Sequence, residues 1–197
     1  MKIATYILSF VLIVLINSCG EIHDAGIITY NNNQVTTSYV VFDKESSKWF
    51  QPKQQQGGEE LNSKYFFKKQ KDDFAIRIFD TPNFKAFNII SPWEGYVKVQ
   101  SNQRKDILGF DCRATEIISR NNRKLFLVWH TDRIQPGVGP EKWWGFNGAV
   151  LEVVDLLNEE TLFKATAIDI DFQEDVLSPP DTTNMINLEK IQDMKNG

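Results

Sequence analysis

Short runs of β-branched and aromatic residues recur along the chain at intervals of about ten to fifteen residues, which limits it to a fold built of strands. In several runs apolar and polar residues alternate. Phe74, Ile76 and Ile78, for example, share one face of an extended segment. This period of two is typical of an antiparallel sheet with one packed face. The strands that we expect are 27–30, 36–42, 64–69, 74–79, 84–90, 96–100, 110–119, 124–130, 149–155 and 162–170.

Length and composition favour a single globular domain. Of the 197 residues, 42% are hydrophobic and 24% are charged, which is ordinary for a globular protein. Such a chain is long enough for one buried core and too short for two comfortable domains. Lys and Arg number 22 against 26 Asp and Glu, without a long basic run, which argues against nucleic acid as a partner. We expect one β-rich domain over residues 26–180, followed by a tail at 181–197.

The N-terminus has the pattern of an export signal. The apolar run from Ile3 to Ile16 is shorter than the roughly twenty residues that a membrane-spanning helix needs, so it indicates the hydrophobic region of a signal peptide. The stretch that ends this run, Ile-Asn-Ser-Cys-Gly at 16–20, resembles the lipobox of bacterial lipoproteins. The resemblance implies that residues 1–18 are removed, that Cys19 is acylated, and that residues 19–25 tether the domain to a membrane. The alternative is an ordinary signal peptide with an incidental cysteine.

The cysteine count agrees with lipidation. The chain has two cysteines, and if Cys19 carries lipid then Cys112 is a lone thiol. Cys112 lies in a strand-like stretch, where a lone cysteine is usually a small buried hydrophobe. The alternative is a nucleophile, which needs a neighbouring base to lower its pKa, and the chain has only two histidines.

Three segments depart from the strand pattern. Residues 51–60 are polar and contain glycine, so we expect a mobile loop there. A short helical turn is expected to begin at Pro140, since the missing N–H of proline costs nothing at the start of a helix. Residues 181–195 offer Asp181 or Thr182 as an N-cap and a thin apolar stripe, which is compatible with a short C-terminal helix.

Residues 129–153, rich in tryptophan and glycine, are the most unusual part of the sequence. They indicate a strand that ends in aromatic residues, a loop with glycine and proline, and a second buried strand. Gly145 and Gly148 flank a tight corner. Glycine at these positions permits a positive φ or a close backbone approach that a Cβ would block.

Several motifs of the chain resemble the GLPGLI family of bacterial lipoproteins, known from the Bacteroidetes group. Residues 145–150, Gly-Phe-Asn-Gly-Ala-Val, correspond to the motif that names the family, and Leu151-Glu152 follows it. A glycine-proline pair, Gly139-Pro140, precedes the motif as it does in the family. The upstream glycine-aromatic-x-cysteine-x-alanine strand of the family is matched by Gly109, Phe110, Cys112 and Ala114, and an earlier family pattern is similar to residues 41–46.

The chain also departs from the family pattern. Phe146-Asn147 replaces leucine-proline, His130 replaces the usual tyrosine, and Arg133 lies in the loop. Because the family has no established activity, the resemblance implies a fold and a location rather than a function. The expected location is the cell envelope, with the outer membrane as the anchor site, and no cofactor is expected. By analogy with open half-barrels of bacterial envelopes, we expect a curved antiparallel sheet, either an open half-barrel or a sandwich-like arrangement.

The aromatic residues of this segment have two interpretations. Trp129, Trp143, Trp144 and Phe146 either line an apolar groove, with His130 beside them, or close one end of the sheet as part of its core. Their size and shape are compatible with both arrangements, and the sequence favours the core.

Catalytic and metal sites have weak support. His130, Asp132 and Glu152 are the candidates for an acid–base group, but no serine elbow and no His-x-x-x-His motif accompanies them. The two histidines, His23 and His130, are far apart in sequence, so we expect no metal site. Glu152 lies between two apolar residues. It either faces solvent or, if it points inward, needs a cationic partner. The candidates for that partner are Arg113, Arg133 and Lys142.

These observations favour a membrane-anchored envelope lipoprotein without enzymatic activity. We expect it to bind an apolar ligand, such as a lipid, or an outer-membrane protein through an aromatic-lined sheet face. The first alternative is a structural or interaction protein with a packed core and no small ligand. The second is a hydrolase that uses His130 or Cys112.

Overall fold

The computed structural model describes residues 21–33, 36–52, 55–56, 59–60, 63–81, 84–91, 93–171 and 177–189. These residues form one twelve-stranded sheet and a separate two-stranded ladder. The strands are β1 (Gly26–Asn32), β2 (Thr36–Phe42), β3 (Ser46–Phe50), β4 (Gln55–Gln56), β5 (Glu59–Glu60), β6 (Ser63–Lys69), β7 (Ala75–Asp80), β8 (Lys85–Ile90), β9 (Tyr96–Ile107), β10 (Phe110–Ser119), β11 (Lys124–Thr131), β12 (Ala149–Asp155), β13 (Glu160–Asp169) and β14 (Ile186–Asn187).

The strand order of the large sheet is β14-β8-β7-β6-β3-β2-β1-β13-β12-β11-β10-β9. All neighbours pair antiparallel except β14, which runs parallel to β8. Two runs of consecutive strands, β1 to β8 and β9 to β13, therefore meet in the middle of the sheet, where β1 pairs with β13. The prediction of a mainly β fold with an antiparallel sheet is confirmed.

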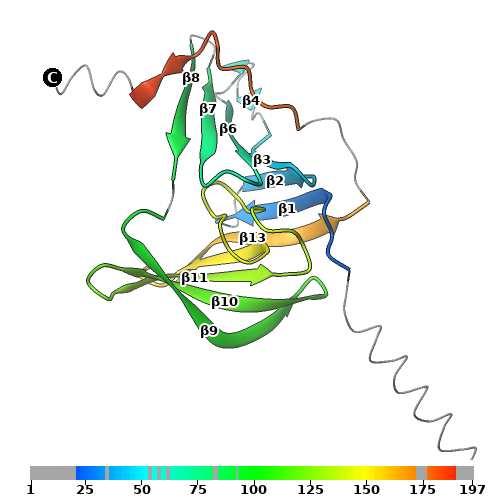
Figure 1. The fold of residues 1–197 in the computed structure, drawn as a ribbon, viewed down its shortest axis with the longest axis vertical. Helices are drawn as coiled ribbons and strands as arrows, with labels where there is room; N and C mark the ends of the chain where they lie inside the picture. Colours follow the sequence, from blue (N-terminus) through cyan, green and yellow to red (C-terminus); the bar gives the residue numbers. More distant parts are fainter. Residues whose placement is uncertain are drawn as a thin grey trace, which may run out of the picture.

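The connection between β8 and β9 requires the sheet to curve. These strands follow one another in sequence with only residues 91–95 between them, yet they lie near opposite edges of the sheet. Strands spaced about 4.8 Å apart would separate β8 from β9 by about 50 Å in a flat sheet, whereas so short a connection reaches about 20 Å. The sheet bends accordingly, with β6 to β8 upright and β9 to β11 across the bottom in Figure 1. The expected curvature is confirmed, and the sheet stays open.

The core lies against this bend and draws on both runs of strands. Fully buried residues of the first run include Ile28, Tyr30 and Phe42, and those of the second include Val128 and Leu151. The Tyr30 hydroxyl donates a 2.6 Å hydrogen bond to the carbonyl oxygen of Val150, so its polar group is satisfied in the core. The long loop between β11 and β12, residues 132–148, lies between strands β6 to β8 and strands β9 to β11 (Figure 1).

The predicted helical segments differ from the structure. The chain turns at Pro140–Trp143, where the Trp143 N–H donates to the Pro140 carbonyl, but Glu141 has φ 46°. Because a right-handed helical turn needs negative φ throughout, this is a tight turn and the expected helical turn is wrong. The helix expected over 181–195 is not formed at 181–187, where Ile186–Asn187 form strand β14. Leu188 and Glu189 are helical, and residues 190–195 lie outside the described residues.

Other differences concern strand ends and loops. The strand expected at 96–100 extends to Ile107, and β3 was not expected at all. Residues 55–56 and 59–60, expected in a mobile loop, pair as β4 and β5. The expected signal peptide and Cys19 lie outside the described residues. Among the residues that are described, no helix is long and apolar enough to cross a membrane.

Candidate functional site

A hollow of about 290 Å³ lies where the free edge of the sheet meets the loop between β11 and β12. Strands β9, β10 and β11 supply one side, and the loop supplies the other. Its volume is at the lower end of the range for small-molecule sites. The lining residues are Lys98, Gln100, Arg113, Thr115, His130, Asp132, Gly145, Phe146 and Asn147.

Strand register brings the polar residues of the hollow together. Arg113 on β10 lies directly opposite His130 on β11, and Thr115 lies directly opposite Gln100 on β9. Directly opposite residues share a face of the sheet, as do residues two apart on one strand. Arg113, Thr115, His130 and Gln100 therefore project from the same face.

His130 is held by hydrogen bonds at both ring nitrogens. Its Nδ1 lies 3.2 Å from the carbonyl oxygen of Asn147, and its Nε2 lies 2.9 Å from the hydroxyl oxygen of Thr115. A carbonyl only accepts, so Nδ1 carries the proton and the neutral ring accepts from Thr115 at Nε2. Burial lowers the pKa of His130 from its usual value, with a smaller lowering from Arg113 that opposes the effects of Asn147 and Asp132. His130 is therefore neutral at pH 7 and adds no charge to the lining of the hollow.

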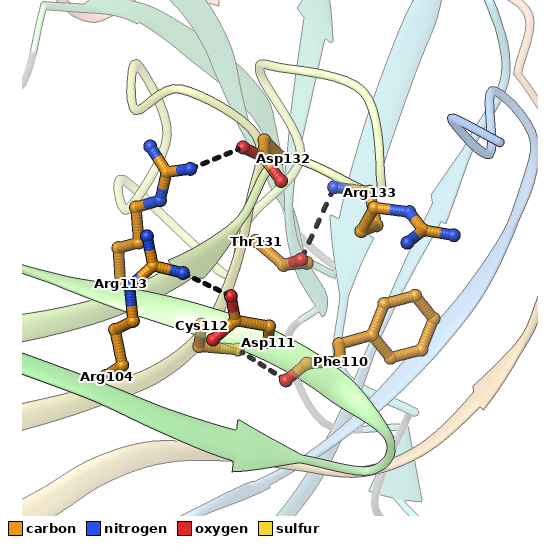
Figure 2. Close-up of polar contacts among 8 residues, drawn as sticks. All are labelled: Arg104, Phe110, Asp111, Cys112, Arg113, Thr131, Asp132 and Arg133. Carbon is orange, nitrogen blue, oxygen red and sulfur yellow. Dashed lines mark hydrogen bonds and ion pairs between the residues drawn. The ribbon is translucent and has the colours of Figure 1, made fainter. Parts of the chain in front are cut away.

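The charged groups of the hollow are two cations and one carboxylate. A guanidinium nitrogen of Arg113 lies 3.3 Å from a carboxylate oxygen of Asp132, and both side chains are partly exposed (Figure 2). Lys98 donates a 2.6 Å hydrogen bond to the carbonyl oxygen of Gly145. Its ammonium group also lies 5.4 Å from the ring centre of Phe146. The lining thus has a surplus of positive charge and of N–H donors.

Glycines shape the loop that closes the hollow. A Cβ on Gly148, which has φ 111°, would lie 1.8 Å from the carbonyl oxygen of Thr131. A Cβ on Gly139 would lie 1.7 Å from the carbonyl oxygen of Trp143. Gly145 has φ 82°. The prediction that glycines 145 and 148 serve positive φ or close backbone approach is confirmed.

The short connection between β8 and β9 also supports this loop. The indole N–H of Trp93 donates a 2.6 Å hydrogen bond to the carbonyl oxygen of Trp144. Its rings pack against Phe146 and Trp143, with ring centres 5.2 and 5.6 Å apart. Phe146 is therefore held by Trp93 as well as by His130, whose ring centre lies 5.5 Å from that of Phe146.

A second hollow of about 430 Å³ adjoins the first and shares Lys98, Gly145 and Phe146 with it. Trp93 and Trp144 line its aromatic side. Lys68, Asp72, Asp73 and Glu94 are its other charged residues. The ammonium group of Lys68 donates to the carbonyl oxygens of Lys69 and Asp72, so it is engaged by the protein itself.

The structure separates the five residues that sequence analysis proposed as a surface. His130 and Phe146 line the first hollow, and Trp144 lines the second. Trp143 is 2% exposed and packs in the core against Phe126. Trp129 is 7% exposed and, adjacent to His130 on β11, lies on the other face of the sheet.

Glu152 lies on the Trp129 side of the sheet, directly opposite that tryptophan. Its side chain is 8% exposed and forms a 2.6 Å ion pair with Lys105, whose ammonium group lies 4.7 Å from the nearest ring centre of Trp129. Glu152 therefore points inward, and the partners expected from the sequence were wrong. The proposed acid–base group is also divided, because Glu152 is on the opposite face from His130.

Cys112 is fully buried beside this pair, as the sequence predicted, and it is a free thiol. Its Sγ lies 3.4 Å from the carbonyl oxygen of Phe110 (Figure 2). Burial raises the pKa of Cys112 to about 12, with further increases from nearby carboxylates such as Asp111. The thiol therefore stays protonated at neutral pH, which makes it a poor nucleophile.

Sequence analysis missed Lys98, Gln100, Thr115 and Trp93 as parts of the site, and named Arg113 only as a partner for Glu152. The alternation in 96–100 and 110–119 was the available signal, since it places these polar residues on one face of their strands. The sequence did not reveal which loop covers that face. Among the described residues, no group of three or more His, Cys, Asp and Glu side chains is arranged to hold a metal ion.

Comparisons with known proteins identify the fold alone. No protein-family model matches the chain, and no curated protein matches its sequence. Two solved structures of PNGF-II, in the C2 and P21 space groups, are similar to it at 16% sequence identity with a TM-score of 0.66. The similarity covers 86% and 87% of this chain, but only 32% and 33% of the PNGF-II chains. The chain thus spans about a third of the length of these structures and shares the fold of that part.

Proposed function

We propose that this chain is a lipid-anchored protein of the bacterial cell envelope, similar to the GLPGLI family, whose β domain binds a small ligand without catalysing a reaction. The observation that carries the proposal is the first hollow, which joins His130 and Phe146 from the motif segment to cationic residues of β9 and β10. Pockets that combine an aromatic wall with a few convergent polar groups are typical of ligand sites. The export pattern and Cys19 support the anchor and the location in the outer membrane.

The hollow favours a ligand with a polar end over a purely apolar one. Of the four large aromatic side chains expected to line a groove, only Phe146 lines this hollow, while Trp143 belongs to the core. Around Phe146 the lining consists mainly of amide, hydroxyl, imidazole and charged groups. A lipid chain would leave these groups without partners, which costs free energy.

Native mass spectrometry of the full-length chain, released from detergent, tests this function. The protein is expressed in a bacterial envelope, and its native mass is compared with its denatured mass. The covalent lipid on Cys19 remains in both measurements, whereas a bound ligand adds mass only to the native form. We expect a defined excess mass that returns when envelope extract is offered. An unchanged mass in every extract would contradict the proposal.

A structural or interaction protein without a small ligand is the second candidate. The observation in its favour is the free edge strand β9, where Tyr96, Val97 and Val99 are between 41% and 53% exposed. An exposed edge with apolar side chains is a surface on which another chain can pair. Crosslinking in the envelope, combined with the mass measurement, separates this function from ligand binding.

The hydrolase alternative now depends on one contact, the 2.9 Å pair between the Thr115 hydroxyl and His130. A histidine that accepts a proton from a hydroxyl is the arrangement of a base and a nucleophile. Thr115 is 7% exposed, however, and the pair satisfies two buried polar groups, which is a sufficient structural role. An envelope phenotype that is lost in both Thr115→Val and His130→Gln, with folding intact, would favour the hydrolase.

A further inference from the structure

The charge and donor balance of the first hollow points to the chemical class of its ligand, an inference that rests on the binding function proposed above. We propose that the hollow binds a small organic carboxylate with a small apolar body. In this arrangement the carboxylate contacts Arg113 and Lys98, and the apolar body lies against the small exposed part of Phe146, which is 7% exposed.

The ion pair of Arg113 uses only part of its N–H donors. A guanidinium group carries five N–H donors in a planar fork that matches a carboxylate. Its ion-pair partner among the described residues is Asp132, with one nitrogen at 3.3 Å from one carboxylate oxygen. Within the described residues no other acceptor is hydrogen-bonded to its remaining N–H groups, so these can receive a second carboxylate in the bidentate geometry that arginine favours.

Lys98 adds a second positive charge from the adjacent wall. Its ammonium group uses one N–H for the Gly145 carbonyl, and within the described part of the chain no carboxylate lies at ion-pair distance. With His130 neutral and Asp132 as the one acid of the lining, the hollow carries a net charge of about +1. An anion would balance that charge.

Phe146 and His130 determine the shape of the ligand body. Their rings lie at 31° to each other with centres 5.5 Å apart, so they pack against each other, and with 7% and 6% of their surfaces exposed they present only a narrow apolar edge to the hollow. The volume of 290 Å³ corresponds to about ten water molecules at roughly 30 Å³ each, which suits a ligand with one ring or a short branched chain. Inorganic phosphate would satisfy the cations but leave this apolar edge uncovered.

Fluorine NMR on the full-length chain in detergent tests the inference with two matched probes, 4-fluorobenzoate and its uncharged analogue 4-fluorobenzamide. We expect 4-fluorobenzoate to bind with a dissociation constant on the order of 1 mM, as suits so small a ligand. The benzamide should bind at least tenfold more weakly. Arg113→Gln should weaken benzoate binding at least tenfold, and Lys98→Met should weaken it less.

Arg104→Gln is the control variant. Arg104 lies directly opposite Arg113 in the sheet and pairs with Asp111, but it does not line the hollow (Figure 2). Benzoate affinity should stay within twofold in this variant. Arg113→Lys should recover part of the lost affinity, and unfolding curves should show that each variant is folded.

Four results would overturn the inference: no benzoate binding, equal binding of the benzamide, unchanged affinity in Arg113→Gln, or displacement of benzoate by inorganic phosphate at equal concentration. The mass measurement above distinguishes this failure from failure of the proposed function. If the protein retains a ligand from envelope extract but does not bind benzoate, the carboxylate inference fails and the binding function stands. If the protein retains no ligand from envelope extract and does not bind benzoate, both the binding function and the carboxylate inference fail.

Discussion

Trp129 and His130 are neighbours in β11, and their side chains occupy opposite faces of the sheet with different electrostatics. On the Trp129 face, the Glu152–Lys105 pair is 2.6 Å long and its carboxylate is 8% exposed. On the His130 face, the Arg113–Asp132 pair is 3.3 Å long and both side chains are more than a third exposed. The first pair is closed and structural, whereas the second retains unused donors beside a hollow. Two ion pairs on opposite faces of one sheet can therefore have different roles, and their burial and geometry distinguish them.

The largest expected effect is on the loop of the His130 face. Gly148→Ala would place a Cβ 1.8 Å from the Thr131 carbonyl oxygen at φ 111°, so the backbone must move. We expect a loss of about 3 kcal/mol or more in the free energy of unfolding, measured by urea denaturation.

Gly109→Ala is the matched control for this clash. Gly109 also has a positive φ, at 82°, but a Cβ there would meet nothing within 4 Å. The loss should be about 1 kcal/mol, the cost of left-handed backbone alone. Equal losses in the two variants would show that close approach to Thr131 does not hold the loop.

The next largest effect is expected for the ion pair between Glu152 and Lys105. Glu152→Gln leaves Lys105 beside a neutral group in a nearly buried site, and we expect the free energy of unfolding to fall by about 2 kcal/mol. The loss is smaller than for a fully buried pair because Lys105 is 35% exposed and its ammonium group can turn to water.

The double variant Glu152→Gln with Lys105→Met sharpens this test. Methionine removes the uncompensated charge and retains contact with Trp129, so part of the stability should return. If the double variant is no more stable than Glu152→Gln alone, the loss does not come from the unpaired lysine.

The pH dependence of stability tests the environment of His130. The pKa of His130 is lowered in the folded state, so below about pH 6.5 the unfolded state binds more protons. Stability should therefore fall as the pH decreases from about 6.5 toward the folded pKa, with a slope of at most about 1.4 kcal/mol per pH unit from this group. His130→Gln should reduce the slope in urea denaturation between pH 7 and 5, whereas His23→Gln should retain the larger part of it.

The smallest effect is expected for the partly exposed ion pair between Arg113 and Asp132. Asp132→Asn removes a partly exposed carboxylate, and the free energy of unfolding should change by less than about 0.5 kcal/mol. A loss as large as that of Glu152→Gln would remove the contrast between the two faces.

Much of the fold could be predicted from the sequence, because alternation is a local property. The bounds of β2 and β10 agree with the predicted runs, and Cys112 is buried as expected. The tight turn at Pro140 was misassigned because proline suits the first turn of a helix, while the left-handed Glu141 gives no sequence signal.

The candidate site could be predicted only in part. His130 and Phe146 were identified from their segment, but Lys98 and Arg113 reach them through strand pairing and through a sheet bent by the β8–β9 connection. The contact between Glu152 and its partner Lys105 also depends on strand pairing. Lys105 lies directly opposite Cys112, in a part of β9 whose polar sequence gave no sign of a strand.

The pairing of β1 with β13 also has a consequence for how the chain folds. Ile27 pairs with Asp169, so strand β1 stays without one neighbour until almost the whole domain has been synthesised. Hairpins such as β10–β11 need only local contacts and should form earlier. We expect pulse-labelling hydrogen exchange during refolding to show protection of β10 and β11 before β1, and the reverse order would contradict this view. The junction of the two runs of strands would then be the last part of the sheet to close.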